Sequence, residues 1–273
     1  MHDAQEHRRS RLLRYAASGR EALADNARHS FAADHALIVY RTGAIYSMIP
    51  KNACTSFRYS LALANGCIDG PEDFAWIHRN NRTFAASPRE IACAPFTFVV
   101  LRDPLARLAS VYLDKIVSRR EQFWGLFDTM KDVTNPDAVT FRKFVDALTE
   151  PFVIGLDIHW RRQANFLVYR DYDLYLDFDE IAEGAAAVAE RAGMEFFDTR
   201  ELAGHDNARF ERVEGGPFPD LPPNEIRTLR AEGKTVALHD LYDGAVRETA
   251  TRLYSEDLEI YETVFGKKPS SLR

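Results

Sequence analysis

The chain has 273 residues, a net charge of −6 and 46 % hydrophobic residues. This composition predicts a soluble globular protein with a sizeable core. The acidic balance argues against nucleic-acid binding, and mildly against a long polyanionic substrate, because the summed field would repel it. The three cysteines have no metal-like spacing and no HExxH pattern occurs, so we expect free thiols in a reducing compartment and no bound metal.

No stretch has the length and apolarity of a signal peptide or of a membrane-spanning helix. We therefore expect a soluble cytoplasmic protein of bacterial type, without a transmembrane segment. The sequence does not predict an oligomeric state.

The first expected elements surround a turn at Pro50-Lys51. Residues 1–30 are charged and rich in alanine, which predicts an N-terminal helix. Two apolar runs on either side of Thr42-Gly43 predict a hairpin or a pair of strands. After the turn, apolar residues at helical spacing predict a helix from about Thr55 to Ala64, with a stop near Gly66.

The middle of the chain contains the clearest strand, "FTFVVL". Its unbroken apolar run is typical of a strand buried on both faces, as in a parallel sheet. Pro104 opens a helix that we expect to reach about Arg120, and "SPRE" at 87–90 predicts a capped helix start. A second strand at 173–178 precedes an alanine-rich helix at 179–192.

Strands that alternate with helices predict a three-layer α/β fold, in which four or five mostly parallel strands are flanked by helices. We expect one domain over residues 1–273, with the α/β core at 31–200. Glycine and proline residues predict a long loop at 201–224, and helices are expected over 225–273.

A candidate anion site lies at "PKNACTS", residues 50–56, where a strand leads through a turn into a helix. The first backbone N–H groups of a helix lack a carbonyl partner inside it and attract anions. Lys51 adds a positive charge, and Thr55 and Ser56 add hydroxyl donors. Here the lysine begins the loop, whereas it ends the loop of Mg-nucleotide-binding P-loops. The alternative is a surface lysine before a capped helix.

A second candidate lies at "RDPLARLASVY", residues 102–112. Arg102 follows the buried strand, and Ser110 lies two helical turns further on. A guanidinium and a hydroxyl that converge there would bind a second phosphate. Two anion sites on successive strand–turn–helix units predict a ligand with two phosphate-like groups.

Both segments resemble signature segments of the sulfotransferases that use 3′-phosphoadenosine 5′-phosphosulfate (PAPS), most closely the carbohydrate and heparan (sulfotransferase family 2-like) branch. "PKNACTS" is similar to their 5′-phosphosulfate loop, and "RDPLARLASVY" to their 3′-phosphate segment. Three further segments resemble that branch: "DIHWRRQANFL" (157–167), "YDLYLDFDEI" (172–181) and "LYSEDLEIY" (253–261). "GHDNARF" (204–210) faintly resembles a loop that closes over the nucleotide.

The resemblance implies a P-loop-like fold and the transfer of a sulfuryl group from PAPS to a hydroxyl of a carbohydrate, glycolipid or other small acceptor. Adenosine 3′,5′-bisphosphate (PAP) would be the product, and no metal would be required. Lys51 would contact the leaving oxygen and the sulfuryl group, residues 52–56 the 5′-phosphate, and Arg102 and Ser110 the 3′-phosphate. The residues implied for the cofactor are Lys51, Asn52, Ala53, Cys54, Thr55, Ser56, Arg102 and Ser110.

His78 is the predicted general base, because histidine titrates near neutrality. Sulfotransferases with a catalytic histidine carry it on a similar segment before the 3′-phosphate arginine. A surface or substrate-contact role is the alternative for His78, and the other candidate bases are His159, Glu72 and Asp73. The predicted acceptor contacts are His159, Trp160 and Arg161.

For several other residues of these segments, a structural or surface role is an alternative to a role in catalysis or binding. Cys54 is expected to contribute its small size rather than a nucleophilic thiol. Arg107 is expected to bond to neighbouring loops, and His159 has a structural role beside Trp160 as its alternative. Six arginines suit either an acceptor rim or ordinary surface charge: Arg79, Arg82, Arg119, Arg120, Arg161 and Arg162.

Two other functions fit parts of the pattern. One is a Mg-dependent nucleotide kinase, against which the lysine-first loop and the absence of a clear acidic Mg ligand after a strand both argue. The other is a non-catalytic relative that binds PAP, against which the presence of Lys51 and His78 argues.

Overall fold

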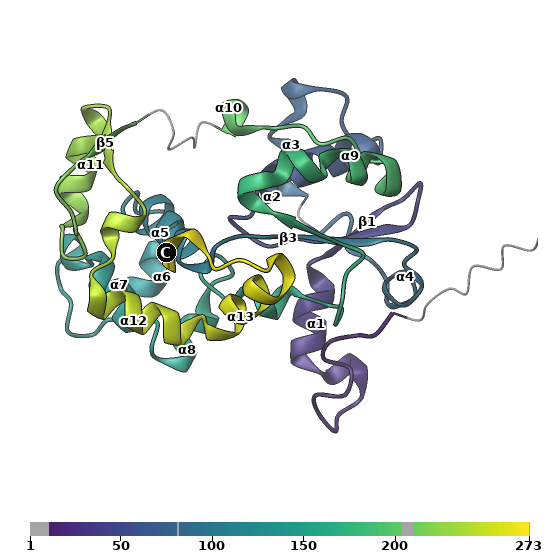
Figure 1. Ribbon diagram of the computed structural model, residues 1–273, viewed down its shortest axis with the longest axis horizontal. Helices are drawn as coiled ribbons and strands as arrows, with labels where there is room; N and C mark the ends of the chain where they lie inside the picture. Colours follow the sequence, from purple (N-terminus) through teal and green to yellow (C-terminus); the bar gives the residue numbers. More distant parts are fainter. Residues whose placement is uncertain (1–10, 81, 204–209, 273) are drawn as a thin grey trace, which may run out of the picture. The chain divides into compact units, whose positions relative to one another are not determined.

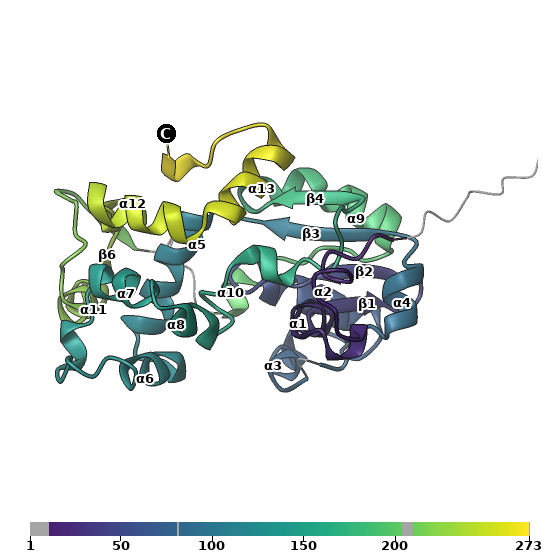
Figure 2. The same cartoon turned by 90° about the horizontal axis from the view of Figure 1, so that it is seen from below.

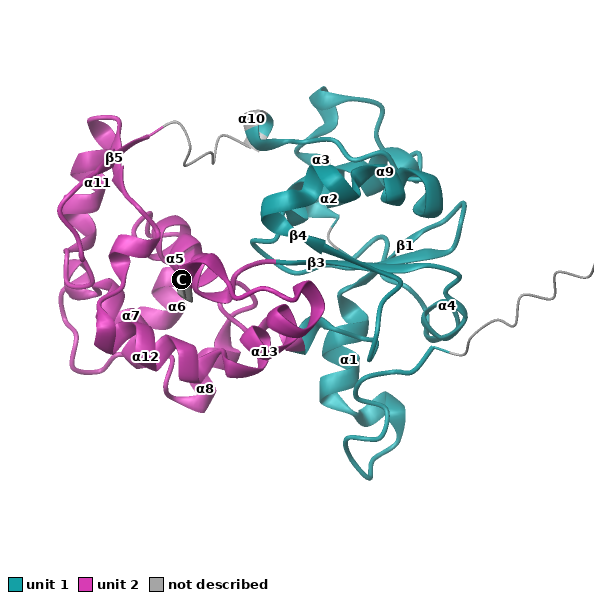
Figure 3. Cartoon of the chain, in the orientation of Figure 1, with its two compact units in different colours: residues 1–101, 165–202 teal, residues 102–164, 203–273 magenta. Residues whose placement is uncertain are grey.

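The structure is a computed structural model, and it describes residues 11–80, 82–203 and 210–272. The chain divides into two compact units (Figure 3). Unit 1 comprises residues 1–101 and 165–202, and unit 2 comprises residues 102–164 and 203–273. The two units are interleaved along the chain, and a single domain over 1–273 stays a prediction.

Unit 1 is built on a four-stranded sheet in the order β1-β2-β3-β4, whose strands lie side by side in Figure 2. The first two strands form an antiparallel hairpin, and the next two pairings are parallel. The strands are β1 (Ala36–Val39), β2 (Ala44–Ser47), β3 (Thr97–Leu101) and β4 (Leu174–Asp177). This confirms the prediction of a mixed α/β fold with a mostly parallel sheet.

Helices cover both faces of this sheet. In Figure 1, α2 (Cys54–Ala64) and α9 (Ile181–Ala192) lie on one face and α1 (Ala27–Asp34) on the other. The ring of Phe57 on α2 stacks on Tyr46 of β2, which stacks on Phe98 of β3, with 5.1 Å between ring centroids in each pair. The shorter helices are α3 (Trp76–Arg79), α4 (Pro88–Cys93) and α10 (Arg200–Ala203).

Unit 2 is mostly helical and has its own apolar core. Tyr112, Phe144 and Trp160 meet there, with ring centroids 5.8 Å apart for the first pair and 5.7 Å for the second. Its helices are α5 (Pro104–Val111), α6 (Glu121–Phe127), α7 (Phe141–Ala147), α8 (Pro151–Leu156), α11 (Pro223–Ala231), α12 (Gly244–Leu253) and α13 (Ser255–Phe265).

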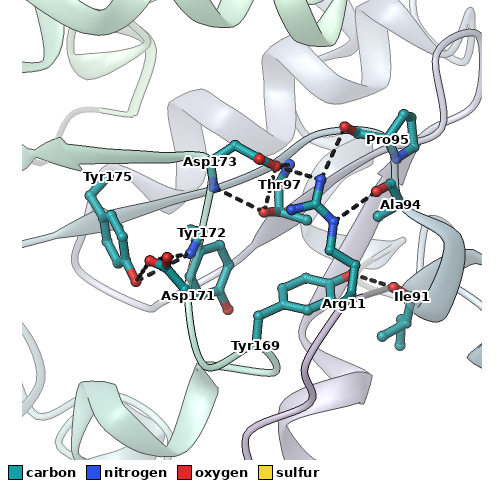
Figure 4. Close-up of polar contacts among 10 residues, drawn as sticks. All are labelled: Arg11, Ile91, Ala94, Pro95, Thr97, Tyr169, Asp171, Tyr172, Asp173 and Tyr175. Carbon is teal, nitrogen blue, oxygen red and sulfur yellow. Dashed lines mark hydrogen bonds and ion pairs between the residues drawn. The ribbon is translucent and has the colours of Figure 1, made fainter. Parts of the chain in front are cut away.

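The expected helix over residues 1–30 is wrong for its described part before Ala27, apart from a 3₁₀ turn at Leu23–Asp25. The α-helix begins only where the Asn26 side chain accepts a hydrogen bond from the backbone N–H of His29 (3.0 Å). Before this helix, Arg11 bonds to other segments of unit 1. Figure 4 shows Arg11 on the carboxylate of Asp173 (2.6 Å) and on the carbonyls of Ala94 and Pro95.

The helix expected from Pro104 to Arg120 is shorter than predicted. The α-helix ends at Val111, a π-helical turn follows at Tyr112–Ile116, and Arg119 has a left-handed φ of 47°. The guanidinium of Arg119 binds the carboxylate of Asp137 (2.7 Å), which favours a turn there over a continued helix.

The C-terminal region also departs from the prediction. The expected loop 201–224 contains strand β5 (Glu211–Val213), and the expected helices 225–273 are interrupted by strand β6 (Lys234–Val236). These strands pair in parallel. Gly233, with a φ of 79°, ends the path of α11, and the β-branched residues that follow favour a strand. Among the described helices, none combines the length and apolarity needed to cross a bilayer.

We expect Arg11→Ala to lower the free energy of unfolding by about 1–3 kcal/mol, because it leaves the Asp173 carboxylate without its cationic partner. Burial raises the pKa of Asp173, but bonds from Arg11 and Thr97 outweigh it and hold the pKa below its ordinary value of 3.8. The stabilisation is therefore complete at neutral pH and is lost as the pH falls through the folded pKa.

Urea unfolding at pH 7 and at pH 3 measures this difference. Arg82→Ala is the matched control, because its ion pair with Asp34 is exposed. That substitution should change stability by less than about 0.5 kcal/mol. Equal effects of the two substitutions would contradict the role of Arg11.

Candidate functional site

The turn after β2 has a left-handed backbone at two positions without glycine. Lys51 has a φ of 71° and Ala53 a φ of 55°, a region that costs other residues strain. Left-handed residues interspersed in a turn point successive backbone N–H groups into a concavity that suits an anion. One of the two left-handed positions is occupied by a small residue, alanine.

Asn52 holds this turn in place. Its side chain is fully buried, and its amide donates to the carbonyl of Val100 in β3 (2.8 Å). We predicted Asn52 as a cofactor contact, and the structure gives its side-chain amide a partner inside unit 1. This bond ties the turn to β3, and a contact of Asn52 with the cofactor stays a prediction.

The N-terminus of α2 is not closed by its own cap residue. Ala53, at the N-cap, has no polar side chain, whereas Asp103 at the N-cap of α5 accepts hydrogen bonds from the N–H groups of Leu105 (2.9 Å) and Ala106 (3.2 Å). The side chains of Lys51, Cys54 and Thr55 are half-buried around the open N-terminus of α2. The N-terminus of a helix attracts negative charge.

Ser56 has a partner that the sequence does not reveal. Its hydroxyl accepts a hydrogen bond from the N–H of Thr199 (3.1 Å) and lies 3.0 Å from the Thr199 hydroxyl. Both side chains are buried. The two residues are far apart in the chain, so no local spacing signals the pair, and it ties the segment before α10 to α2.

His78 is exposed on α3, with its ring 5.5 Å from the ring of Phe74 in an edge-on arrangement. The guanidinium of Arg58, on α2, donates to the carbonyl of Ile77, the residue before His78. The helix that begins at the turn after β2 therefore also anchors the segment of the predicted base. The alternative base Glu72 is exposed, and Asp73 accepts a hydrogen bond from the N–H of Asp69 (3.2 Å).

In unit 2, Arg102 and Ser110 are both buried, with 9 % and 5 % of their surface exposed. The backbone of Arg102 is bonded on both sides to the side-chain amide of Gln163, and Asp257 accepts from the N–H of Gln163. Burial raises the pKa of Asp257 to about 6, against the lowering effect of its backbone hydrogen bonds.

The acceptor contacts predicted at 159–161 have different environments. The Nδ1 atom of His159 lies 2.6 Å from the Asp157 carboxylate, an arrangement that fixes the ring. Burial raises the pKa of Asp157, but hydrogen bonds and charge from His159 outweigh this and lower it. The Trp160 side chain is fully buried in the core and donates to the Val153 carbonyl (2.9 Å), and a contact of Trp160 with the acceptor stays a prediction.

Arginines of this region bond mainly to backbone carbonyls. Arg107 is buried and donates to the carbonyls of Arg161 (2.9 Å) and Ile158 (3.4 Å), which confirms its predicted role. Arg161 itself donates to the Gly155 carbonyl, and Arg162 to the Leu253 carbonyl (2.7 Å). For Arg162, this contact favours a role in internal bonding over a place in an acceptor rim. The acceptor contact predicted for Arg161 stays a prediction.

The predicted residues thus fall into two groups. Unit 1 carries Lys51 to Ser56 and His78, and unit 2 carries Arg102, Ser110 and His159. Residues 204–209, most of the segment that resembles a nucleotide-covering loop, lie outside the described residues. Within the described ranges, no three or more His, Cys, Asp or Glu side chains are grouped to hold a metal ion.

We expect Ala53→Gly to leave stability unchanged or to raise it by up to about 1 kcal/mol, since glycine is unstrained at a φ of 55°. Ala53→Val should lower stability by more than about 1 kcal/mol, because a β-branched residue is an outlier there. Ala186→Gly, in the exposed interior of α9, should instead lose about 1 kcal/mol. Urea denaturation of the three variants tests the strain, and a loss at Ala53→Gly as large as at Ala186→Gly would contradict it.

Comparison with known proteins adds one match. The model of the sulfotransferase family matches residues 34–263, which is most of the chain and includes parts of both units. No curated protein and no solved structure gives a match.

Proposed function

The chain belongs to the sulfotransferase family, and we propose that it transfers a sulfuryl group from PAPS to a hydroxyl of a carbohydrate, glycolipid or other small hydroxylated acceptor. The family match confirms the resemblance of the sequence to this family. The observation that carries the proposal further is the turn at Lys51–Ala53, which opens on the uncapped N-terminus of α2. Such a turn suits a 5′-phosphosulfate.

In this proposal the 5′-phosphosulfate binds to the backbone N–H groups from Ala53 to Ser56 and to the Thr55 hydroxyl. Asn52 acts by shaping the turn, and Ser56 by its backbone, because its hydroxyl is bonded to Thr199. Cys54 provides a small side chain at the first position of α2. Arg102 and Ser110 bind the 3′-phosphate of the same nucleotide.

Transfer requires an in-line acceptor, stabilisation of the leaving phosphate and removal of the acceptor proton. We assign the second task to the Lys51 ammonium group, whose positive charge meets the charge that develops on the bridging oxygen. We assign the third to His78, which would take the proton of the attacking hydroxyl as the oxygen bonds to sulfur and the bond to the leaving oxygen breaks. PAP then leaves, and no step calls for a metal ion.

The donor site is tested by calorimetric titration of PAP without metal. We expect wild-type protein to bind, and Arg102→Ala to bind at least about tenfold more weakly, because hydrogen bonds to charged groups contribute about 1.5–3 kcal/mol. Arg252→Ala, an exposed arginine of α12, is the matched control and should bind as wild type does. Absence of binding by wild type would reject the proposed function.

The base is tested by a sulfuryl-transfer assay on His78→Ala. Turnover should fall about 10²- to 10⁴-fold, the usual contribution of a positioned base, while PAP affinity stays unchanged. His239→Ala, an exposed histidine outside the proposed site, is the control. Near-normal turnover of His78→Ala together with a large loss in His159→Ala would move the base to His159.

A further inference from the structure

Gln163 bonds to both backbone groups of Arg102 with one side chain. Its Oε1 atom accepts from the Arg102 N–H (3.1 Å), and its Nε2 atom donates to the Arg102 carbonyl (2.8 Å). Gln163 is only 2 % exposed, so water does not compete freely for these bonds. The pair of bonds fixes the peptide groups on both sides of the Arg102 α-carbon.

Gln163 is held in turn by a buried carboxylate. The two oxygens of Asp257, on α13, accept from the N–H groups of Gln163 (2.7 Å) and Ala164 (2.9 Å). Asp257 is 3 % exposed, and a carboxylate is costly to bury unless hydrogen bonds satisfy it. Neutral groups could hold the backbone at Gln163 and Ala164 with a smaller desolvation cost. The use of a charged carboxylate therefore indicates that a rigid backbone is needed at these residues.

The residue that follows Arg102 is fixed as firmly. The Asp103 carboxylate caps α5 and also accepts from the backbone N–H (2.8 Å) and the hydroxyl (2.7 Å) of Ser271. Arg102 is thus the residue between the end of β3 and a fully bonded helix cap. The two bonds from Gln163 restrict the backbone dihedral angles of Arg102 itself. A fixed backbone limits where a long arginine side chain can place its guanidinium.

We propose that Gln163 and Asp257 are positioning residues that orient the Arg102 guanidinium toward the 3′-phosphate of the nucleotide. This role rests on the proposed function. They do not touch the ligand. Their effect should therefore be confined to ligands that carry a 3′-phosphate, whereas a general loosening of unit 2 would weaken the binding of every nucleotide.

The test compares two probes, PAP and adenosine 5′-monophosphate, which lacks the 3′-phosphate. Gln163→Ala should weaken the binding of PAP about ten- to a hundredfold, which is the range known for groups that orient metal ligands. The affinity for the monophosphate should stay within about twofold of the wild-type value. Gln163→Glu, which keeps the acceptor but loses the donor to the Arg102 carbonyl, should act in the same direction. Asp257→Asn should have a smaller effect of the same kind, since the asparagine side chain keeps one of the two oxygens that accept from the backbone N–H groups.

Tyr254→Phe is the matched control. Its hydroxyl donates to the Trp160 carbonyl (2.5 Å), so it joins the same two regions of unit 2 without reaching Arg102. Thermal unfolding of each variant is measured beside calorimetry. A further check is Gln163→Ala in an Arg102→Ala background, where PAP affinity should not fall any further.

The outcomes separate the two proposals. If wild type binds PAP no better than the monophosphate, the proposed function fails and this inference fails with it. If wild type prefers PAP but Gln163→Ala weakens both probes equally, or Tyr254→Phe weakens PAP as much, only the positioning role is overturned. An unchanged PAP affinity in both folded Gln163 variants would also overturn it.

Discussion

The buried hydrogen bond from the Asn52 amide to the Val100 carbonyl is the interaction on which the turn after β2 depends. Two non-glycine residues of that turn have left-handed backbones, each of which costs about 1–3 kcal/mol and persists only where the surrounding structure imposes it. Asn52 imposes it, because β3 is central in the sheet and its backbone is fixed by strands on both sides. Strain is thereby stored where an anion would be bound.

The consequences of that anchoring continue along α2. Ser56 and Ser60 bind the N–H groups of Thr199 and Phe197, and Arg58 binds the segment that carries His78. One helix therefore connects the turn after β2 at its start with two distant segments along its sides. We therefore expect substitutions of Arg58 or Ser60 to affect both the N-terminus of α2 and the segments bonded to its sides.

Sequence patterns predicted the local elements best and the long-range bonds least. β3 and α2 were recognisable because an unbroken apolar run and a helical spacing each report on burial along one segment. By contrast, the partner of Gln163 lies 94 residues away, and that of Ser56 lies 143 residues away, so neither leaves a local pattern. The prediction for the N-terminal region was wrong for a related reason. Its composition suits a helix, but Arg11 forms an ion pair with Asp173, the residue before β4, which lies far away in the sequence.

The signature segments also mix two kinds of residue that spacing does not separate. Arg102 and Arg107 belong to one segment, yet Arg107 bonds to carbonyls in the interior of unit 2. Trp160 similarly lies next to His159 but fills the core. The proposed site was thus predictable as a set of segments, while the division of labour among their residues required the three-dimensional contacts.

The interleaving of the two units has a consequence for how the chain folds. β3 cannot pair with β4 until the whole of segment 102–164 has been synthesised, because that segment lies between them. Until then, β3 presents an unpaired apolar edge on the nascent chain, the kind of edge that recruits other strands. The pairing is also strongly non-local, which slows folding. Early collapse of 102–164 into its own helices would shorten the distance between the two strands and limit the time for which that edge is exposed.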